Sequence, residues 1–205
     1  MKTVTINDIR GNLLNSVEIP DDTPKDQEIK VALEKLVQLR VSLEGANLYR
    51  ANLEGANLTN ANLIRVDLRK ANLYQANLYS ASLQEARLEG ANLFGTNLFK
   101  ANLEGVNLYE ASLYRANLQG ANLERAIIKE GVTLLKGGYF TVTNIGSKQE
   151  TLEVFNTEVG LYFRRGCFFG NEEEFRAAVT EKHGNNKYAK MYLLQIDYAK
   201  IKFNI

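Results

Sequence analysis

The chain has one cysteine, Cys167, and one histidine, His183. Their thiol and imidazole groups are the side chains best suited to catalysis or zinc binding. A nucleophilic cysteine needs a base within hydrogen-bond reach and a third group that orients this base. A structural zinc site needs about four ligands, so one Cys and one His are too few. Cys167 lies between Gly166 and Phe168, which is typical of a buried corner, and His183 lies where a helix is expected to end. We therefore expect structural roles for both, with no catalytic residue and no metal site.

Other signatures of chemistry are missing from the sequence. Gly137-Gly138 is too short for a phosphate-binding loop, and no G-x-x-x-x-G-K-[ST] motif occurs. No set of residues combines a nucleophile, a base and an oxyanion stabiliser. The sequence therefore predicts a protein that is not an enzyme and uses no cofactor.

The balance of charge limits the classes of partner. The chain has 25 Lys and Arg and 24 Asp and Glu, so it has neither the basic excess of a nucleic-acid binder nor the acidic excess of a nucleic-acid mimic. One cysteine excludes an internal disulfide, and no apolar run resembles a signal peptide or approaches the ~18 residues of a membrane span. We expect a cytoplasmic protein with no nucleic-acid and no membrane partner.

Leucine recurs at every fifth position from Leu43 to Leu123, seventeen times without a break. The residue two positions before each Leu is small, and the residue one position before is Asn at twelve sites. A period of five advances roughly 500° around a helix and alternates faces in a strand, so neither element gathers these Leu in one core. A chain that turns a corner every five residues can do so, provided that each coil hydrogen-bonds to the next, as in a solenoid.

The pattern A-N-L-x-x, as in Ala46-Asn47-Leu48-Tyr49-Arg50, resembles the pentapeptide-repeat family over residues 41–128. The resemblance implies an all-β solenoid, a right-handed quadrilateral β-helix with four pentapeptides per coil. It also implies that the small residue and the Leu fill the interior and that the Asn-type residues stack along the corners.

Residues twenty apart should stack in successive coils, so the outward position after each Leu sorts into four faces. On two neighbouring faces this position is repeatedly aromatic. These five residues, called the aromatic ladder below, are Tyr74, Phe94 and Tyr114 on one face and Tyr79 and Phe99 on the next. Rings about 5 Å apart attract one another and would stabilise the coils, whereas an exposed apolar patch usually marks an interface. As a candidate partner surface, the ladder could take another protein, a second copy or the chain's own C-terminal segment.

Two positions depart from the repeat pattern. Arg87 replaces Asn at a corner and is expected to point outward, near Glu85 and Glu89. Thr96 replaces an inward Ala and must find a backbone acceptor for its hydroxyl.

A hairpin and a capping helix are expected before the repeats, over residues 1–40. The hairpin covers residues 2–19, with a turn at Gly11-Asn12. Thr23 is expected to cap a helix over about residues 24–39. The apolar stripe of this helix comprises Ile29, Ala32, Leu33, Leu36, Val37 and Leu39. A solenoid end exposes core and strand edge, so we interpret the helix as a lid, and a partner-binding helix is the alternative.

After the repeats of residues 41–130, residues 131–205 are expected to form a small β-meander and two helices (α+β). Strands are predicted over 139–143, 152–156 and 160–164, followed by a helix from Asn171 to His183 and another over about 187–200. The two helices are expected to bury Phe175, Ala178, Val179, Ala189, Tyr192, Leu193, Ile196 and Ala199.

This C-terminal segment also resembles a known module. The residues that carry the resemblance are Arg165-Gly166-Cys167-Phe168-Phe169-Gly170, Glu174-Phe175 and His183-Gly184-Asn185-Asn186. Such a module follows pentapeptide repeats in many bacterial and phage-like proteins. The resemblance implies a fold and no chemistry.

The sequence favours a non-enzymatic binding or scaffold protein that presents flat faces for protein–protein contact. The alternative is a DNA mimic that protects topoisomerase, as some pentapeptide-repeat proteins do. Mimicry requires a strongly negative shaft, but residues 41–125 hold eight acidic and eight basic residues. Ile64 and Gln84 interrupt the most acidic face. Self-association as a homodimer, through a shaft face or the C-terminal module, is also expected.

Overall fold

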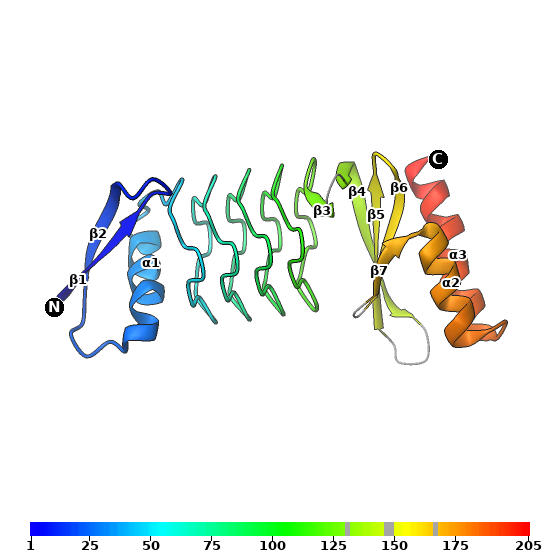
Figure 1. Ribbon diagram of the computed structural model, residues 1–205, viewed down its shortest axis with the longest axis horizontal. Helices are drawn as coiled ribbons and strands as arrows, with labels where there is room; N and C mark the ends of the chain where they lie inside the picture. The colour runs from blue at the N-terminus through cyan, green and yellow to red at the C-terminus, as the bar shows by residue number, and fades with distance from the viewer. Residues whose placement is uncertain (130–131, 146–149, 166–167) are drawn as a thin grey trace. The chain divides into compact units, whose positions relative to one another are not determined.

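The computed structural model describes residues 1–129, 132–145, 150–165 and 168–205. The chain divides into two compact units, Met1–Gly131 and Val132–Ile205. The first unit contains β1, β2, α1 and the repeats, and the second contains the strands from β4 to β7 with α2 and α3 (Figure 1).

The repeats stack as coils of twenty residues. Parallel bridges join residues twenty apart along the repeat segment, from Asn47 with Asp67 to Asn107 with Ile127, where strand β3 (Ile127–Lys129) begins. The N–H of each Leu from Leu43 to Leu108 donates to a carbonyl nineteen residues later, as from Leu48 to Asp67 at 2.8 Å. Four pentapeptides therefore complete one coil, and every fifth residue returns to the same interior.

The interior of the coils is apolar. All seventeen Leu are at most 6% exposed, which confirms the inward direction predicted from the period. Thr96 is also fully buried, and its hydroxyl donates to the carbonyl of Leu73 at 2.7 Å. The Leu73 carbonyl is thus the backbone acceptor that the sequence analysis required, and the buried hydroxyl keeps a hydrogen bond.

Asn at the corners holds the turns and links the coils. The Asn97 Oδ1 accepts the N–H of Phe99 at 3.1 Å, and the Asn97 Nδ2 donates to Asn77 Oδ1 in the neighbouring coil at 3.0 Å. The second residue after each Leu takes a positive φ, as in Gly90 at 66° and Arg65 at 55°. This left-handed turn is easy for Gly and costs other residues roughly 1–2 kcal/mol.

The N-terminal segment covers the first coil. Strands β1 (Lys2–Asn7) and β2 (Leu13–Ile19) pair antiparallel, which confirms the predicted hairpin, and α1 (Glu28–Gln38) follows. The Asn7 carbonyl accepts the N–H of Asn47 at 2.8 Å, and the Glu34 carboxylate accepts the N–H of Asn57 at 2.8 Å. These groups satisfy donors that another coil would otherwise bind, so the segment acts as a lid.

The start and end of α1 correct two sequence predictions. A 3-10 turn (Lys25–Gln27) precedes α1, and no side chain caps either element, so the predicted Thr23 cap is wrong. Pro24 begins this turn by accepting the N–H of Gln27 at 2.9 Å. Leu39 was expected in the apolar stripe but is 63% exposed, because it lies beyond the last turn of α1.

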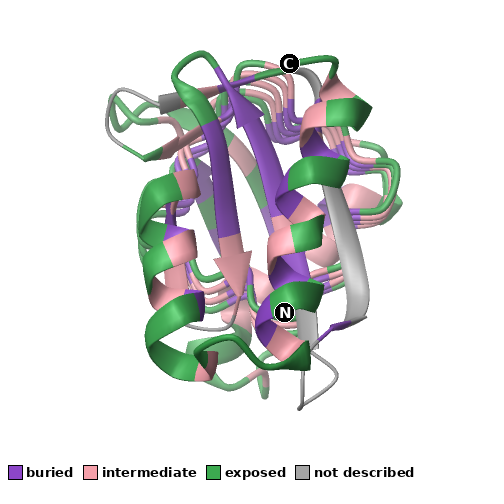
Figure 2. Cartoon of the chain, turned by 90° about the vertical axis from the view of Figure 1, so that its right-hand side faces the viewer, coloured by how far each residue is buried: buried purple, intermediate pink, exposed green. Residues whose placement is uncertain are grey.

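The second unit is an antiparallel sheet with two helices packed against it. Its strands β4 (Val132–Ile145), β5 (Glu150–Thr157), β6 (Gly160–Arg165) and β7 (Phe168–Asn171) are hydrogen-bonded in sequence order. Helices α2 (Glu172–His183) and α3 (Lys187–Phe203) follow. Figure 2 shows both helices with exposed residues on their outer sides.

The core of the second unit includes Val154, Phe163, Phe175, Tyr192 and Ile196. Asn171 caps α2 in a reciprocal capping box with Glu174, which confirms the predicted helix start. Strand β7 was not predicted. Its two Phe pack on different partners, Phe168 against Phe175 and Phe169 against Tyr162, so this strand lacks the alternation on which the prediction relied.

Candidate protein-binding surface

The aromatic ladder consists of two stacks of rings on the repeat coils. The Tyr74 and Phe94 rings lie 5.2 Å apart at 16°, and the Phe94 and Tyr114 rings lie 5.4 Å apart at 46°. On the neighbouring face, the Tyr79 and Phe99 rings lie 5.8 Å apart at 15°. The twenty-residue period therefore brings together all five residues within their stacks, as the sequence predicted.

The corner Asn residues orient the ladder. In four of these five turns the Asn Oδ1 accepts the N–H of the aromatic residue, at 3.2 Å for Tyr74 and at 3.1 Å for Phe94, whereas the corner residue before Tyr114 is Ser112. The aromatic side chain thus leaves the coil at a fixed point, directly after a buried Leu. Tyr114 is 42% exposed, and the other four rings are partly exposed.

Basic side chains lie against the ladder. The Arg115 guanidinium lies 5.5 Å from the Tyr114 ring centre and 5.9 Å from that of Phe94, and the Lys100 ammonium lies 5.3 Å from the Phe99 ring centre. A cation within about 6 Å of an aromatic face is attracted by it. The surface therefore combines apolar area with positive charge.

A buried acidic residue on another face was missed by the sequence analysis. Asp67 is 2% exposed, and it accepts hydrogen bonds from Arg69 Nε at 2.8 Å and Nη2 at 2.6 Å. Arg87, twenty residues later, places Nη1 3.7 Å from the same carboxylate and Nε 3.9 Å from Glu89. Glu85, which was expected near Arg87, instead pairs with Arg65 at 3.0 Å.

The twenty-residue spacing was the available signal for this cluster. Asp67 and Arg87 both replace Asn in one column of corners, so each fills the position stacked on the other. The two carboxylates of the cluster lie beside its two guanidinium groups, which indicates a stabilising role.

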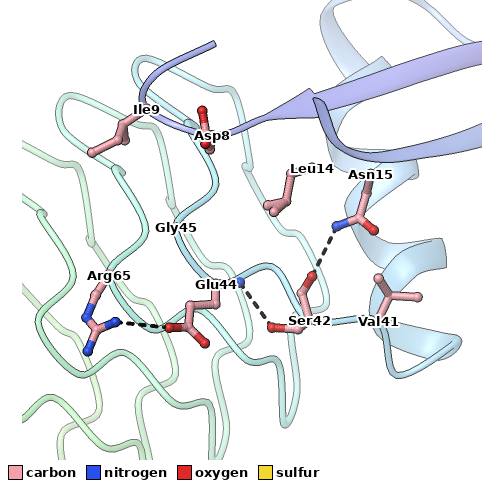
Figure 3. A pocket seen from close by; sticks show the side chains of 9 residues that line it. All are labelled: Asp8, Ile9, Leu14, Asn15, Val41, Ser42, Glu44, Gly45 and Arg65. Carbon is pink, nitrogen blue, oxygen red and sulfur yellow. Dashed lines mark hydrogen bonds and ion pairs between the residues drawn. The ribbon is translucent and has the colours of Figure 1, made fainter. Parts of the chain in front are cut away.

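A groove of about 590 Å³ lies between the hairpin turn and the first coil (Figure 3). Asp8, Glu44 and Arg65 supply its charged groups. Arg65 pairs with Glu44 at 3.3 Å, and Asp8 accepts the N–H groups of Asn12 and Arg10. The hydrogen bond from the Asn12 side chain is the largest cause that holds the pKa of Asp8 below its ordinary value. Each charged group is thus already paired, and the groove carries no arrangement that points to a ligand.

His183 lies at the end of α2, as predicted, and packs against aromatic residues. Its ring lies 5.6 Å from that of Tyr192 at 25°, and its Nε2 is buried without a hydrogen bond among the described residues. Burial lowers the pKa of His183, and the charges of Arg165 and Lys182 act in the same direction. Cys167 and Gly166 lie outside the described residues, so the predicted buried corner remains a prediction.

No group of three or more His, Cys, Asp or Glu in the described part of the chain is arranged to hold a metal ion. None of its helices has both the length and the apolar character needed to cross a bilayer.

Coils that repeat every twenty residues, with side chains stacked along their outer faces, define a repeat protein. Within this class, residues 40–129 match the pentapeptide-repeat family. The sequence model of this family, described as pentapeptide repeats, matches in eight copies over residues 40–75, 56–95, 71–108 and 91–129. This match confirms the resemblance of residues 41–128 to the pentapeptide-repeat family.

Several solved pentapeptide-repeat proteins are similar to the chain. Rfr23 from the cyanobacterium Cyanothece 51142 is 39% identical over 43% of this chain and 61% of its own, with a TM-score of 0.43. HetL from Nostoc sp. strain PCC 7120, a protein involved in heterocyst differentiation regulation, is 34% identical over 45% of each chain, with a TM-score of 0.41. A protein from the Arabidopsis thaliana thylakoid lumen is 31% identical over 42% of this chain and 59% of its own, with a TM-score of 0.40.

The chain thus spans less than two thirds of the length of each of these proteins. No curated protein matches the chain.

Proposed function

We propose that this protein is a non-enzymatic scaffold that binds a partner protein through the aromatic ladder. The observation that carries the proposal is the stacking of five partly exposed aromatic rings on two neighbouring faces of the coils. Aromatic side chains supply large contact area with few rotatable bonds, and they are enriched among the residues that dominate binding energy.

The coils have other sources of stability, so the ladder is available for binding. Backbone hydrogen bonds, buried Leu and the Asn corners join each coil to the next. Ring stacking adds about 0.5–1.5 kcal/mol per pair beyond burial. Partial exposure of the rings leaves apolar area that a partner would remove from water.

The chemistry of the ladder favours a partner with apolar and acidic side chains. Arg115 and Lys100 flank the rings, whereas Glu54, the nearest acid along the column below Tyr74, is held by Asn72 Nδ2 at 3.2 Å. A partner carboxylate would meet the two cations at the rim of an apolar surface. Binding should therefore weaken as salt concentration rises.

The arrangement of charges argues against DNA mimicry. Arg65 pairs with Glu44 at 3.3 Å and with Glu85 at 3.0 Å, and Arg125 pairs with Glu104. Two acidic residues of the most negative face, Glu44 and Glu104, are thus paired with Arg side chains of the adjacent turn. Topoisomerase protection remains the alternative, and protection in a gyrase supercoiling assay at micromolar protein would favour it.

We also infer that the coils form the right-handed quadrilateral β-helix implied by the family. Four columns of parallel bridges per coil support a four-sided cross-section. A crystal structure of the repeat segment tests this inference, and a left-handed coil would contradict it.

The proposal is tested by affinity capture from lysate of the source organism, with the tagged wild-type protein and two tagged variants as bait. Phe94→Asp places a charge in the longer stack, and Tyr109→Asp makes the same kind of change on another face, where Tyr109 is 37% exposed. We expect the captured amount of a specific partner protein to fall at least tenfold with Phe94→Asp and to stay at the wild-type amount with Tyr109→Asp. Circular dichroism should show that both variants keep the β-structure. A partner that binds all three proteins equally would refute the proposal.

A further inference from the structure

Helix α3 carries a second apolar stripe that the second unit does not bury. Its inner face places Ala189, Tyr192, Ile196 and Ala199 in the core, each at most 1% exposed. At 100° per residue, the other stripe lies roughly on the opposite side of the helix. Its members are Met191 (38% exposed), Leu194 (61%), Tyr198 (50%) and Ile201 (79%).

The spacing of this stripe is that of a coiled coil. The four residues follow one another at intervals of three, four and three, which are the a and d positions of two heptads. A helix that only covers a sheet has no need for apolar residues on its outer side, where polar residues are usual. Figure 2 shows the outer side of α3 as exposed.

We propose that this stripe, called the α3 seam, pairs with the α3 seam of a second copy of the chain in a parallel two-helix coil. The charges beside the seam select this occupant and this direction. Asp197 takes a g position and Lys202 takes the e position of the following heptad. In a parallel pair, the g residue of one helix faces the e residue five positions later on the other. Each Asp197 then faces the Lys202 of the other copy, twice by symmetry.

An antiparallel pair built on the same apolar residues is disfavoured. It would place Met191 opposite Ile201 and Leu194 opposite Tyr198, and the two Asp197 carboxylates would then face each other. Exposed ion pairs contribute little affinity, but opposite and like charges at these positions decide orientation and partner choice.

The length of the seam sets the expected strength. Two heptads bury a small apolar area, and the helices are already folded before they pair. We expect a dissociation constant on the order of 10–100 µM. The α3 seam and the aromatic ladder lie in different units, so this self-association is independent of the proposed scaffold function.

Sedimentation equilibrium across protein concentrations is the first experiment. The mass should rise from the 23.0 kDa of one chain towards twice that value. Ile201→Glu and Leu194→Glu should each weaken association at least tenfold, because these exposed side chains contribute to the seam and not to the core. Val159→Asp is the matched control, since Val159 is 64% exposed on the turn between β5 and β6. A single-chain mass up to about 1 mM, or a dimer that is equally stable in all variants, would overturn the proposal.

Two further measurements test the direction of pairing. Asp197→Lys and Lys202→Asp should each weaken the dimer, and combining them should restore it. Ile201→Cys, in a Cys167→Ser background, should form a disulfide-linked dimer, because d positions are adjacent in a parallel pair. In the antiparallel pair the two Ile201 positions are about 15 Å apart and would not cross-link. Failure of both the charge exchange and the cross-link would overturn the parallel arrangement.

Discussion

Asp67 offers the most direct test of how a coil accommodates a departure from its repeat. Its side chain is 3% exposed and is held by Arg69 at 2.6 Å and 2.8 Å, with Arg87 at 3.7 Å. Burial raises the pKa of Asp67, but the hydrogen bonds and charge of Arg69 and the charge of Arg87 outweigh burial. The pKa therefore lies below its ordinary value.

The expected strength of the Asp67–Arg69 pair follows from its exposure. A hydrogen bond to a charged group contributes about 1.5–3 kcal/mol, whereas a fully exposed ion pair contributes about 0–1 kcal/mol. Asp67 is buried and Arg69 is 35% exposed, so the pair lies between these limits. We expect a coupling energy of about 1–2 kcal/mol at neutral pH.

A double-mutant cycle measures this coupling energy. The variants are Asp67→Asn, Arg69→Gln and both together, compared by urea denaturation at pH 7. Asn keeps an oxygen that can accept the backbone N–H of Arg69, now 3.2 Å from Asp67 Oδ1. The cycle thus isolates the charged interaction from the turn. A coupling energy below about 0.5 kcal/mol would show that the pair is no stronger than an exposed one.

The same cycle has a defined pH dependence. Because the pKa of Asp67 is lowered in the folded protein, the coupling is fully present above the ordinary carboxyl pKa of about 3.9. It is lost as the pH falls through the lower value of the folded protein, where Asp67 becomes protonated. A coupling energy that is already lost at pH 5 would contradict this sign.

Three other changes test separate parts of the structure. Leu93→Asp should abolish the β-structure signal in circular dichroism, because Leu93 is fully buried and an unpaired buried charge costs several kcal/mol. A folded variant with wild-type stability would refute the claim that Leu93 lies in an apolar interior. Gly90→Val should lower the free energy of unfolding by about 1–2 kcal/mol, and Gly90→Asn by less, because Gly90 has a φ of 66° that Asn tolerates better than Val. Equal urea midpoints for the two variants would argue against backbone strain. His183→Gln should reduce the pH dependence of stability near pH 6. The pKa of His183 is lowered in the folded protein, so the stability that comes from the neutral ring is lost as the pH falls below about 6.5. Thermal melting of both proteins at pH 5 and pH 8 measures this difference.

The repeat coils were predictable because the residues that determine each turn lie within a single pentapeptide. An inward Leu, a small inward partner and a corner Asn are all read from five consecutive residues, and the period then places Phe94 over Tyr74. Thr96 was also predictable, since a buried hydroxyl at an inward position has backbone carbonyls within reach.

The elements that escaped prediction depend on tertiary contacts. Strand β7 has Phe168 and Phe169 packed on different partners, so it shows no polar alternation. The start of α1 has the sequence of a capped helix, yet the chain enters it through a 3-10 turn and the Lys2 ammonium binds the carbonyl of Thr23 at 2.6 Å. The α3 seam was missed because the sequence analysis considered only the apolar residues on the buried face of this helix.

The twenty-residue coil has a consequence for how such proteins change in length. Removing one pentapeptide, such as residues 81–85, would keep every later Leu inward but rotate the later surface by one side of the coil. Tyr79 would then meet Glu104 in place of Phe99, and Phe94 would lie above Arg69. The interior accepts insertions and deletions in steps of five, whereas the recognition surface survives only steps of twenty. Selection on binding should therefore leave whole-coil gains and losses as the tolerated form of length variation.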